Sequence, residues 1–172
     1  MANCTVTAFI DGKALHDATR AIDLHVDFKR LREWLESRHP EGRILRLVFA
    51  TLHDDQAEYS NVRPLLDYLE YNGYQLIVKP MRSYDEGRYR GSVIPELYAE
   101  ALRYGHQRSI THAYLFAGDG DYATLVRELK QLGVVVTVVS LLSSMVADEL
   151  RRAADEFVDL RTIIDEIDRS DR

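Results

Sequence analysis

Two aspartates, Asp119 and Asp121, lie two residues apart in the stretch FAGDGDYATLV (116–126), at the end of an apolar run. A third, Asp11, ends another apolar run, TVTAFID (5–11). Clustered carboxylates repel one another, and a divalent cation relieves that repulsion. Because the sequence shows no Cys or His cluster, oxygen ligands favour Mg²⁺ or Mn²⁺ over zinc. An ion held in this way is suited to the hydrolysis of phosphate esters.

Two further acids, Glu96 and Glu100, are spaced one turn apart on an expected helix and are candidates for the same site. Each acid also has an ordinary structural interpretation. An aspartate before a glycine, as at Asp11, is common in turns. Asp121 suits the N-cap of the following helix, and glutamates on a helix usually face solvent. The sequence leaves both interpretations open.

The elements that must position these acids follow from hydrophobic periodicity, because strand-like runs alternate with helical patterns. The expected strands are residues 5–11, 43–51, 74–80, 111–118 and 134–141, with a short one at 157–160. The expected helices are residues 28–39, 58–73, 95–107, 122–133, 145–155 and 161–169. This order predicts an α/β fold, a three-layer α/β/α sandwich around a doubly wound, mostly parallel sheet of about five strands. Functional groups then gather beyond the carboxyl ends of the strands.

The composition is that of an ordinary globular domain: 172 residues, 46% hydrophobic and 29% charged. We expect residues 1–160 to form the domain and residues 161–172 to add an amphipathic helix and tail to it. The sequence does not decide whether that helix packs on the domain or pairs with a second copy in a homodimer. There is no apolar run of about 18–20 residues that could cross a bilayer, no signal-peptide pattern and a single cysteine, Cys4. These features predict a cytoplasmic protein without membrane contact.

A candidate RNA-binding segment lies between the third strand and the next helix, in KPMRSYDEGRYR (79–90). Cations neutralise phosphates and aromatic rings stack on bases, which is what a groove for single-stranded RNA requires. The net charge of −6 argues against broad binding over the whole surface, so we expect a local patch. Its candidate substrate-binding residues are Lys79, Arg82, Arg88 and Arg90. The alternative is a solvated loop with ordinary surface arginines.

Three segments resemble the NYN domains, LabA-like branch, of the PIN-like nuclease superfamily. They are FIDG (9–12), AGDGDYATLVRELKQLGVVVTVVS (117–140) and LRRAADEFVDL (150–160). The resemblance implies a PIN-like fold and a metal-dependent ribonuclease site. It assigns Asp11, Asp119 and Asp121 to the metal. In the segment 89–102, Glu100 falls near a further family acid and Glu96 lies close by.

The chain also departs from the family pattern. Ile94 stands where the family usually has an aspartate, and Ala14 stands where it has an asparagine. We therefore carry two hypotheses. The first is an endoribonuclease with catalytic residues Asp11, Asp119, Asp121 and Glu100, in which Glu96 helps to hold Mg²⁺ or Mn²⁺. The second is a catalytically weakened NYN-fold protein that binds RNA or has a regulatory role. A phosphatase or nucleotidase acting on a small phosphate ester is a weaker third interpretation.

Overall fold

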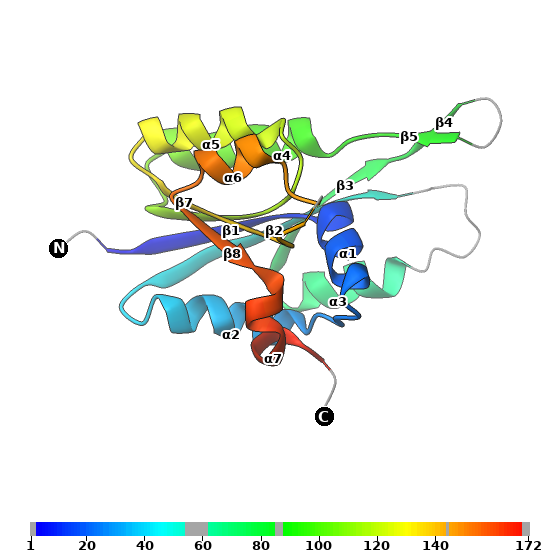
Figure 1. The fold of residues 1–172 in the computed structure, drawn as a ribbon, viewed down its shortest axis with the longest axis horizontal. Helices are drawn as coiled ribbons and strands as arrows, with labels where there is room; N and C mark the ends of the chain where they lie inside the picture. Colours follow the sequence, from blue (N-terminus) through cyan, green and yellow to red (C-terminus); the bar gives the residue numbers. More distant parts are fainter. Residues whose placement is uncertain (1–2, 54–61, 85–87, 144, 170–172) are drawn as a thin grey trace.

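A six-stranded parallel sheet forms the middle layer of the molecule, in the order β3-β2-β1-β6-β7-β8 (Figure 1). The computed structural model describes residues 3–53, 62–84, 88–143 and 145–169, with the backbone alone for 82–84 and 88–90. The strands are β1 (Thr5–Asp11), β2 (Arg43–His53), β3 (Tyr74–Pro80), β6 (His112–Phe116), β7 (Val135–Ser140) and β8 (Glu156–Asp159). The expected fold class is confirmed. The sixth strand, β8, is the short final one expected near residues 157–160.

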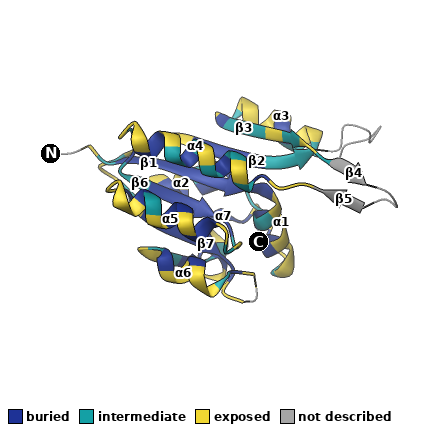
Figure 2. Ribbon diagram, turned by 90° about the horizontal axis from the view of Figure 1, so that it is seen from above, coloured by how far each residue is buried: buried dark blue, intermediate teal, exposed yellow. Residues whose placement is uncertain are grey.

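Helices cover both faces of this sheet, so its central strands are largely buried. One layer contains α1 (Gly12–Ala21), α2 (Phe28–Arg38), α3 (Arg63–Tyr71) and α7 (Ile164–Ile167). The other contains α4 (Ile94–His106), α5 (Tyr122–Gln131) and α6 (Asp148–Ala153). Every residue of β1 is buried. Figure 2 shows the buried strands beneath helices that expose only their outer surfaces.

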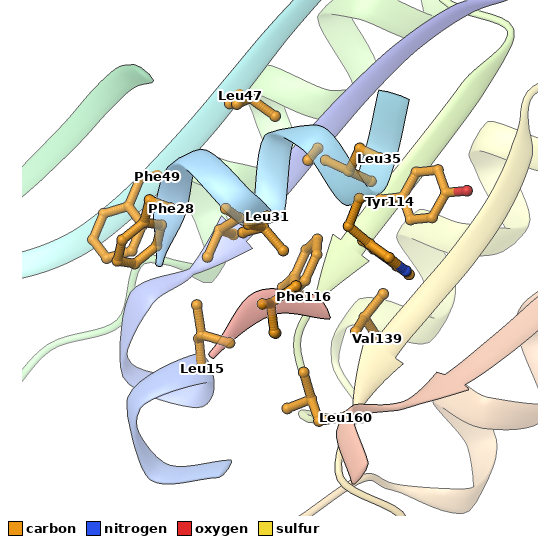
Figure 3. Close-up of a cluster of buried hydrophobic side chains, with 14 of the residues drawn as sticks. Leu15, Phe28, Leu31, Leu35, Leu47, Phe49, Tyr114, Phe116, Val139 and Leu160 are labelled. Atoms are coloured by element: carbon orange, nitrogen blue, oxygen red, sulfur yellow. The ribbon is translucent and has the colours of Figure 1, made fainter. Parts of the chain in front are cut away.

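The alternation of side chains along β1 divides the core into two clusters. Ala8 and Ile10 pack toward α1 and α2, whereas Phe9 packs toward α4 and α5, because successive side chains of a strand point to opposite faces. Figure 3 shows part of the first cluster, in which Leu31 of α2 lies among other apolar side chains. The odd-numbered face of β1 therefore leads from Phe9 to Asp11, on the same side as α5.

Two features differ from the expected elements. Helix α1 starts directly after β1, where only a turn was expected. Its buried residues Leu15, Ala18 and Thr19 have the spacing of one helical face. The polar segment after β3 contains an antiparallel hairpin, β4 (Arg82–Tyr84) and β5 (Arg88–Arg90), with Arg82 level with Arg90. Figure 1 shows this hairpin projecting beyond the carboxyl end of β3.

The C-terminal segment packs on its own domain. Ile163 and Ile167 are buried in the first core cluster. The backbone N–H of Asp27 donates to the carbonyl of Ile167 (2.8 Å), and the Arg30 guanidinium donates to the carbonyl of Asp168 (2.7 Å). The sequence left open whether this helix packs on the domain or pairs with a second copy. In the structure it packs on the domain. No helix in the described part of the chain is long and apolar enough to span a bilayer.

The strand order reverses at the pair formed by β1 and β6. From β1 the chain adds β2 and then β3 on one side, and it returns to add β6, β7 and β8 on the other. Ligands of open parallel sheets bind in the crevice beyond the carboxyl ends of the strands at such a reversal. Ile10 lies level with Phe116, so Asp11 and the turn that starts at Ala117 leave the sheet side by side.

Candidate active site

Asp11 is held rigidly at the carboxyl end of β1. It is the N-cap of α1, and its Oδ1 accepts a hydrogen bond from the backbone N–H of Ala14 (3.2 Å). Its Oδ2 accepts a second one from the hydroxyl of Tyr122 (2.8 Å). Only 7% of Asp11 is exposed. Asp11 therefore caps a helix instead of beginning a simple turn, and the same bonds orient its carboxylate toward the reversal point of the sheet.

Tyr122 is a buried residue whose hydroxyl pKa is affected by several acids of the site. Burial raises the pKa of its hydroxyl, and the charge of Asp11, the hydrogen bond to Asp11, and the charges of Asp119 and Glu96 raise it further. The phenol therefore stays protonated and remains a hydrogen-bond donor to Asp11. The charges of Asp11, Asp119 and Glu96 therefore all act on this one hydroxyl.

A cleft of about 310 Å³ opens beside these groups. It is lined by Asp11, Lys13, Ala14, Asp17, Gly118, Asp119 and Met145. Asp11 and Asp119, which were predicted to share a site, thus line the same cleft. The loop after β6 and the segment before α6 form one of its walls, tied by the hydrogen bond from the Ala147 N–H to the Gly118 carbonyl (2.9 Å).

Asp119 and Asp121 have different local roles. Oδ1 of Asp119 accepts the backbone N–H of Asp121 (2.9 Å), which fixes the turn between them. Asp121 occupies the N-cap position of α5, but its side chain makes no capping bond there. Both side chains are exposed. Asp119 faces the cleft, whereas Asp121 is not among its lining residues.

The two candidate glutamates of α4 lie in different surroundings. Glu96 forms an ion pair with Lys79 (2.7 Å), and its charge acts on Tyr122. Glu100 instead binds Arg103 (2.5 Å) and accepts a bond from the side chain of Gln75 (2.8 Å). Gln75 lies in β3, level with Val48 of β2. Because β3 is two strands from β1, this anchor is roughly 10 Å across the sheet from the Asp11 strand. The structure thus brings Glu96, rather than Glu100, toward the cleft.

The predicted substrate-binding residues lie on or near the hairpin. Lys79, at the end of β3, donates to the carbonyl of Ser92 (3.0 Å) besides pairing with Glu96. Arg82 belongs to β4, and Arg88 and Arg90 to β5; their side chains lie outside what the structure describes. The hairpin itself projects beyond the carboxyl end of β3 (Figure 1), and Asp11 and Asp119 lie at the carboxyl ends of β1 and β6 in the same parallel sheet.

Sequence reasoning missed several groups. Tyr122 was assigned only to a helix, although it directly follows the GDGD turn that contains Asp119. Lys13 and Asp17 were missed because α1 was missed. They form an ion pair (2.6 Å) on its first turns. The hydrogen bond to Asp17 raises the pKa of Lys13, and the charge of Asp11 adds to this effect, so the cleft carries a permanent cation.

The sequence has no motif of clustered Cys and His residues, but the structure brings such residues together from three segments that lie far apart in the chain. Cys4, His39 and His112 come from three segments, and their donor atoms all lie within 4.8 Å of one another. Within the described part of the chain, the acids of the cleft do not form a three-residue group this close. The spacing of these residues in the sequence gives no sign of the cluster, because only the pairing of β1 with β6 brings Cys4 near His112.

A more voluminous hollow, of about 540 Å³, lies among α1, α2 and α3 and is lined mainly by apolar side chains. Leu15, Phe28, Phe49 and Leu65 contribute to it. None of its described lining residues is an acid, so we place the candidate chemistry in the smaller cleft.

Comparison with known proteins agrees with this architecture. Residues 5–164 match the NYN domain family, and the chain belongs to that family. The low amplitude and bright protein LabA of Synechococcus elongatus is similar to it, with 28% identity over 167 residues that cover 95% of this chain and 88% of that protein. The crystal structure of a protein of unknown function from Vibrio parahaemolyticus has the same fold, with a TM-score of 0.74 and 18% identity. That similarity covers 92% of this chain and 93% of the other.

Proposed function

We propose that this protein is a divalent-metal-dependent ribonuclease that hydrolyses phosphodiester bonds of single-stranded RNA. The observation that supports this most directly is the convergence of Asp11 and Asp119 on one cleft at the reversal point of the sheet. Membership of the NYN domain family supports the same class of activity.

The donor set of the cleft fits Mg²⁺ or Mn²⁺. Its candidate ligands are carboxylates, from Asp11, Asp17 and Asp119, and none of its described lining residues carries a thiol or an imidazole. Mg²⁺ is commonly held by one or two carboxylates together with waters and substrate phosphates, so a closed group of three acids is not required. In addition, Oε2 of Glu96 is buried and has no hydrogen-bond partner among the described residues. A cation or a bound water would satisfy this oxygen.

The residues of the cleft have separable roles in this proposal. When bound, the ion supplies a polarised phosphoryl oxygen and an acidic water. Tyr122 and the Ala14 N–H hold Asp11 in one orientation. Asp119 presents its carboxylate from the opposite wall, and Lys13 offers a cation that can contact a phosphate. Asp121 and Glu96 do not line the cleft and are further metal-site candidates.

RNA is the proposed substrate because of the hairpin. Arg82, Arg88 and Arg90 would contact the phosphate backbone, and the neighbouring tyrosines would stack on unpaired bases. The hairpin projects beyond the carboxyl end of β3 (Figure 1), and the cleft is lined by residues that follow the carboxyl ends of β1 and β6 in the same parallel sheet. A strand lying along it would therefore pass the acids.

The test is cleavage of a labelled single-stranded RNA with Mn²⁺ or with EDTA, using the wild-type chain and Asp119→Asn. Asp67→Asn, on the exposed surface of α3, is the matched control. We expect Asp119→Asn to lower the rate roughly a hundredfold or more, as removal of one transition-state-stabilising group does. We expect Asp67→Asn to retain the rate. Equal cleavage by the Asp119 variant, or in EDTA, would refute this site.

A second candidate function is RNA binding without hydrolysis. It is favoured by Ile94, which begins α4 where the resemblance leads one to expect an acid, and by the absence of a compact three-acid group among the described residues. In that case RNA would bind with equal affinity to wild type and Asp119→Asn, and no divalent ion would support turnover.

A further inference from the structure

Cys4, His39 and His112 meet at the amino ends of the strands, on the edge of the sheet opposite the acidic cleft. Cys4 directly precedes β1, His112 begins β6, and His39 follows α2. The Cys4 Sγ lies 3.5 Å from Nδ1 of His39 and 3.4 Å from Nδ1 of His112. Because β1 has seven residues, about 3.3 Å apart along the strand, this cluster lies roughly 20 Å from the acids.

These separations match those of ligands around one tetrahedral ion. Zinc binds thiolate sulfur at about 2.3 Å and imidazole nitrogen at about 2.0–2.1 Å. At the tetrahedral angle, those bond lengths place sulfur and nitrogen about 3.6 Å apart. The observed S···N distances of 3.5 and 3.4 Å therefore leave room for a zinc ion after small side-chain shifts.

The surroundings of His39 direct its Nδ1 toward the cluster. Its Nε2 lies 2.8 Å from the hydroxyl of Tyr114, and this hydroxyl oxygen also accepts a bond from Nε of Arg38 (2.9 Å). The oxygen has two lone pairs and can accept from both groups. The tautomer with its proton on Nε2 then leaves Nδ1 unprotonated. Metal-bound histidines are commonly oriented in this way by a partner on the other ring nitrogen.

The His112 imidazole can turn toward a metal ion without leaving the hydroxyl of Thr111 unpaired. Its Nδ1 lies 2.9 Å from the hydroxyl of Thr111. That hydroxyl has a second acceptor, the carbonyl of Thr5 at 3.2 Å, and it already accepts the Thr5 N–H at 2.9 Å. Thr111 therefore keeps its hydrogen bonds when the imidazole turns toward a metal.

We propose that Cys4, His39 and His112 form a second metal site, which binds Zn²⁺ through one sulfur and two nitrogens. All three residues are partly exposed, so a water molecule can complete the tetrahedron. The ion would join the amino end of β1, the start of β6 and the end of α2. This soft donor set differs from the oxygen set of the cleft, so the two sites select different metals.

The first test is titration of the full-length chain with Co²⁺. Cys4 is the only cysteine in the chain, so a thiolate-to-cobalt charge-transfer absorption reports on this site alone. We expect this absorption to saturate at one cobalt per Cys4 site and to be lost when Zn²⁺ displaces the cobalt. Cys4→Ser should abolish the absorption, and His39→Gln and His112→Gln should weaken binding by at least about tenfold.

Two variants separate coordination from general damage. Tyr114→Phe removes the group that orients His39, and we expect it to weaken cobalt binding about tenfold. His106→Gln, at the end of α4, should leave binding unchanged. An absorption that persists at full strength in His39→Gln and His112→Gln would overturn the proposal, as would no absorption from the wild type with excess cobalt.

A measurement on the wild type alone covers the case in which the variants fail to fold. Zinc bound to the sulfur should slow alkylation of Cys4 by iodoacetamide at least about tenfold, because the free thiolate is the nucleophile. An alkylation rate that does not depend on zinc would identify the cluster as a hydrogen-bonded thiol and exclude the metal site. Neither experiment depends on RNA cleavage, so failure of the ribonuclease proposal would not alter the result.

Discussion

Tyr122 connects the stability of the core to the geometry of the cleft. Its ring is packed in the second core cluster, while its hydroxyl binds the carboxylate of Asp11. Because burial and the nearby negative charges raise the pKa of this hydroxyl, it keeps its proton at pH values at which an exposed tyrosine would lose it. One buried side chain thus keeps the orientation of Asp11 independent of pH in the alkaline range.

Tyr122→Phe should therefore be costly although it removes a single oxygen. A hydrogen bond to a charged group contributes about 1.5–3 kcal/mol, and we expect the free energy of unfolding to fall by that amount in urea titrations. RNA cleavage should fall as well, because Asp11 loses its fixed orientation. Tyr98→Phe is the control. It removes a 2.9 Å bond from a phenol to Glu128 in a more exposed position, so its cost should be smaller. Equal losses in the two variants would contradict this role of Tyr122.

Glu100 is expected to contribute to stability instead of catalysis. Its hydrogen bond with Arg103 lowers its pKa below the usual 4.5; burial opposes this effect and Gln75 adds to it. A depressed folded-state pKa contributes stability above the unfolded-state value, and this contribution is lost as the pH falls through the folded-state value.

Glu100→Gln tests this assignment. The difference in unfolding free energy between wild type and variant should be constant near neutral pH and should shrink below about pH 4.5. The measurement is denaturant unfolding at a series of pH values from neutral to acidic. RNA cleavage at neutral pH should be retained in Glu100→Gln and reduced in Glu96→Gln. The reverse pattern would restore Glu100 to the catalytic set.

At the level of elements, the regular strands and helices followed from hydrophobic periodicity, and the shorter elements did not. Helix α1 was missed because Asp11 and Gly12 were interpreted as a turn, although the apolar spacing of Leu15 and Ala18 was present in the sequence. The hairpin β4–β5 was missed because its two three-residue strands are too short for a period of two to be recognised. Both elements border the candidate site, so its details were less predictable than the sheet.

Gly118 shows how closely the elements around the cleft approach each other. A Cβ atom at this position would lie 1.8 Å from the carbonyl oxygen of Met145. The loop after β6 and the segment before α6 can therefore pack together only if residue 118 has no side chain. The same contact places Met145 and Asp119 on one wall of the cleft.

Gly118→Ala should lower the free energy of unfolding by about 1–3 kcal/mol, the usual cost of overpacking, and should also reduce cleavage because Asp119 shifts. Gly133→Ala is the matched control. Gly133 has a φ of +83° but open space around its Cβ position, so alanine there is strained only in the backbone. Both variants should lose stability, as measured by urea unfolding, and only Gly118→Ala should lose cleavage beyond the fraction that is unfolded. Normal activity in the Gly118→Ala variant would show that the wall does not position Asp119.

For the whole molecule, the topology could be predicted from the sequence. Which side chains meet in space could be predicted only in part. Placing Asp11 and Asp119 at one edge required only that parallel strands end together. To decide which of Glu96 and Glu100 lies near the cleft, one must know how α4 is rotated about its axis. Their four-residue spacing does not define that rotation. To predict that Cys4, His39 and His112 meet, one must know the register of β1 against β6 and the position at which α2 ends. No local sequence pattern contains that information.

Metal binding should appear as a change in the stability of the whole domain. At a free Mn²⁺ concentration a hundredfold above the dissociation constant, mass action adds about 2.7 kcal/mol, which for a chain of this size raises the Tm by roughly 5–10 °C. Differential scanning fluorimetry of wild type and Asp11→Asn/Asp119→Asn should show this rise only in the wild type. Cys4→Ser should keep it, because Mn²⁺ prefers oxygen ligands. A rise that survives in the double variant would place the ion elsewhere.

The reversal of strand order has a mechanical consequence. Where β1 meets β6, the first half of the chain is joined to the second along a seam that runs from Val6 beside His112 to Ile10 beside Phe116. The acidic cleft lies at one end of this seam and the Cys4 cluster at the other. An ion bound at either place would therefore cross-link the two halves of the chain. With ions bound at both sites, the protein should require the highest force for mechanical unfolding and should exchange the amide hydrogens of β1 most slowly.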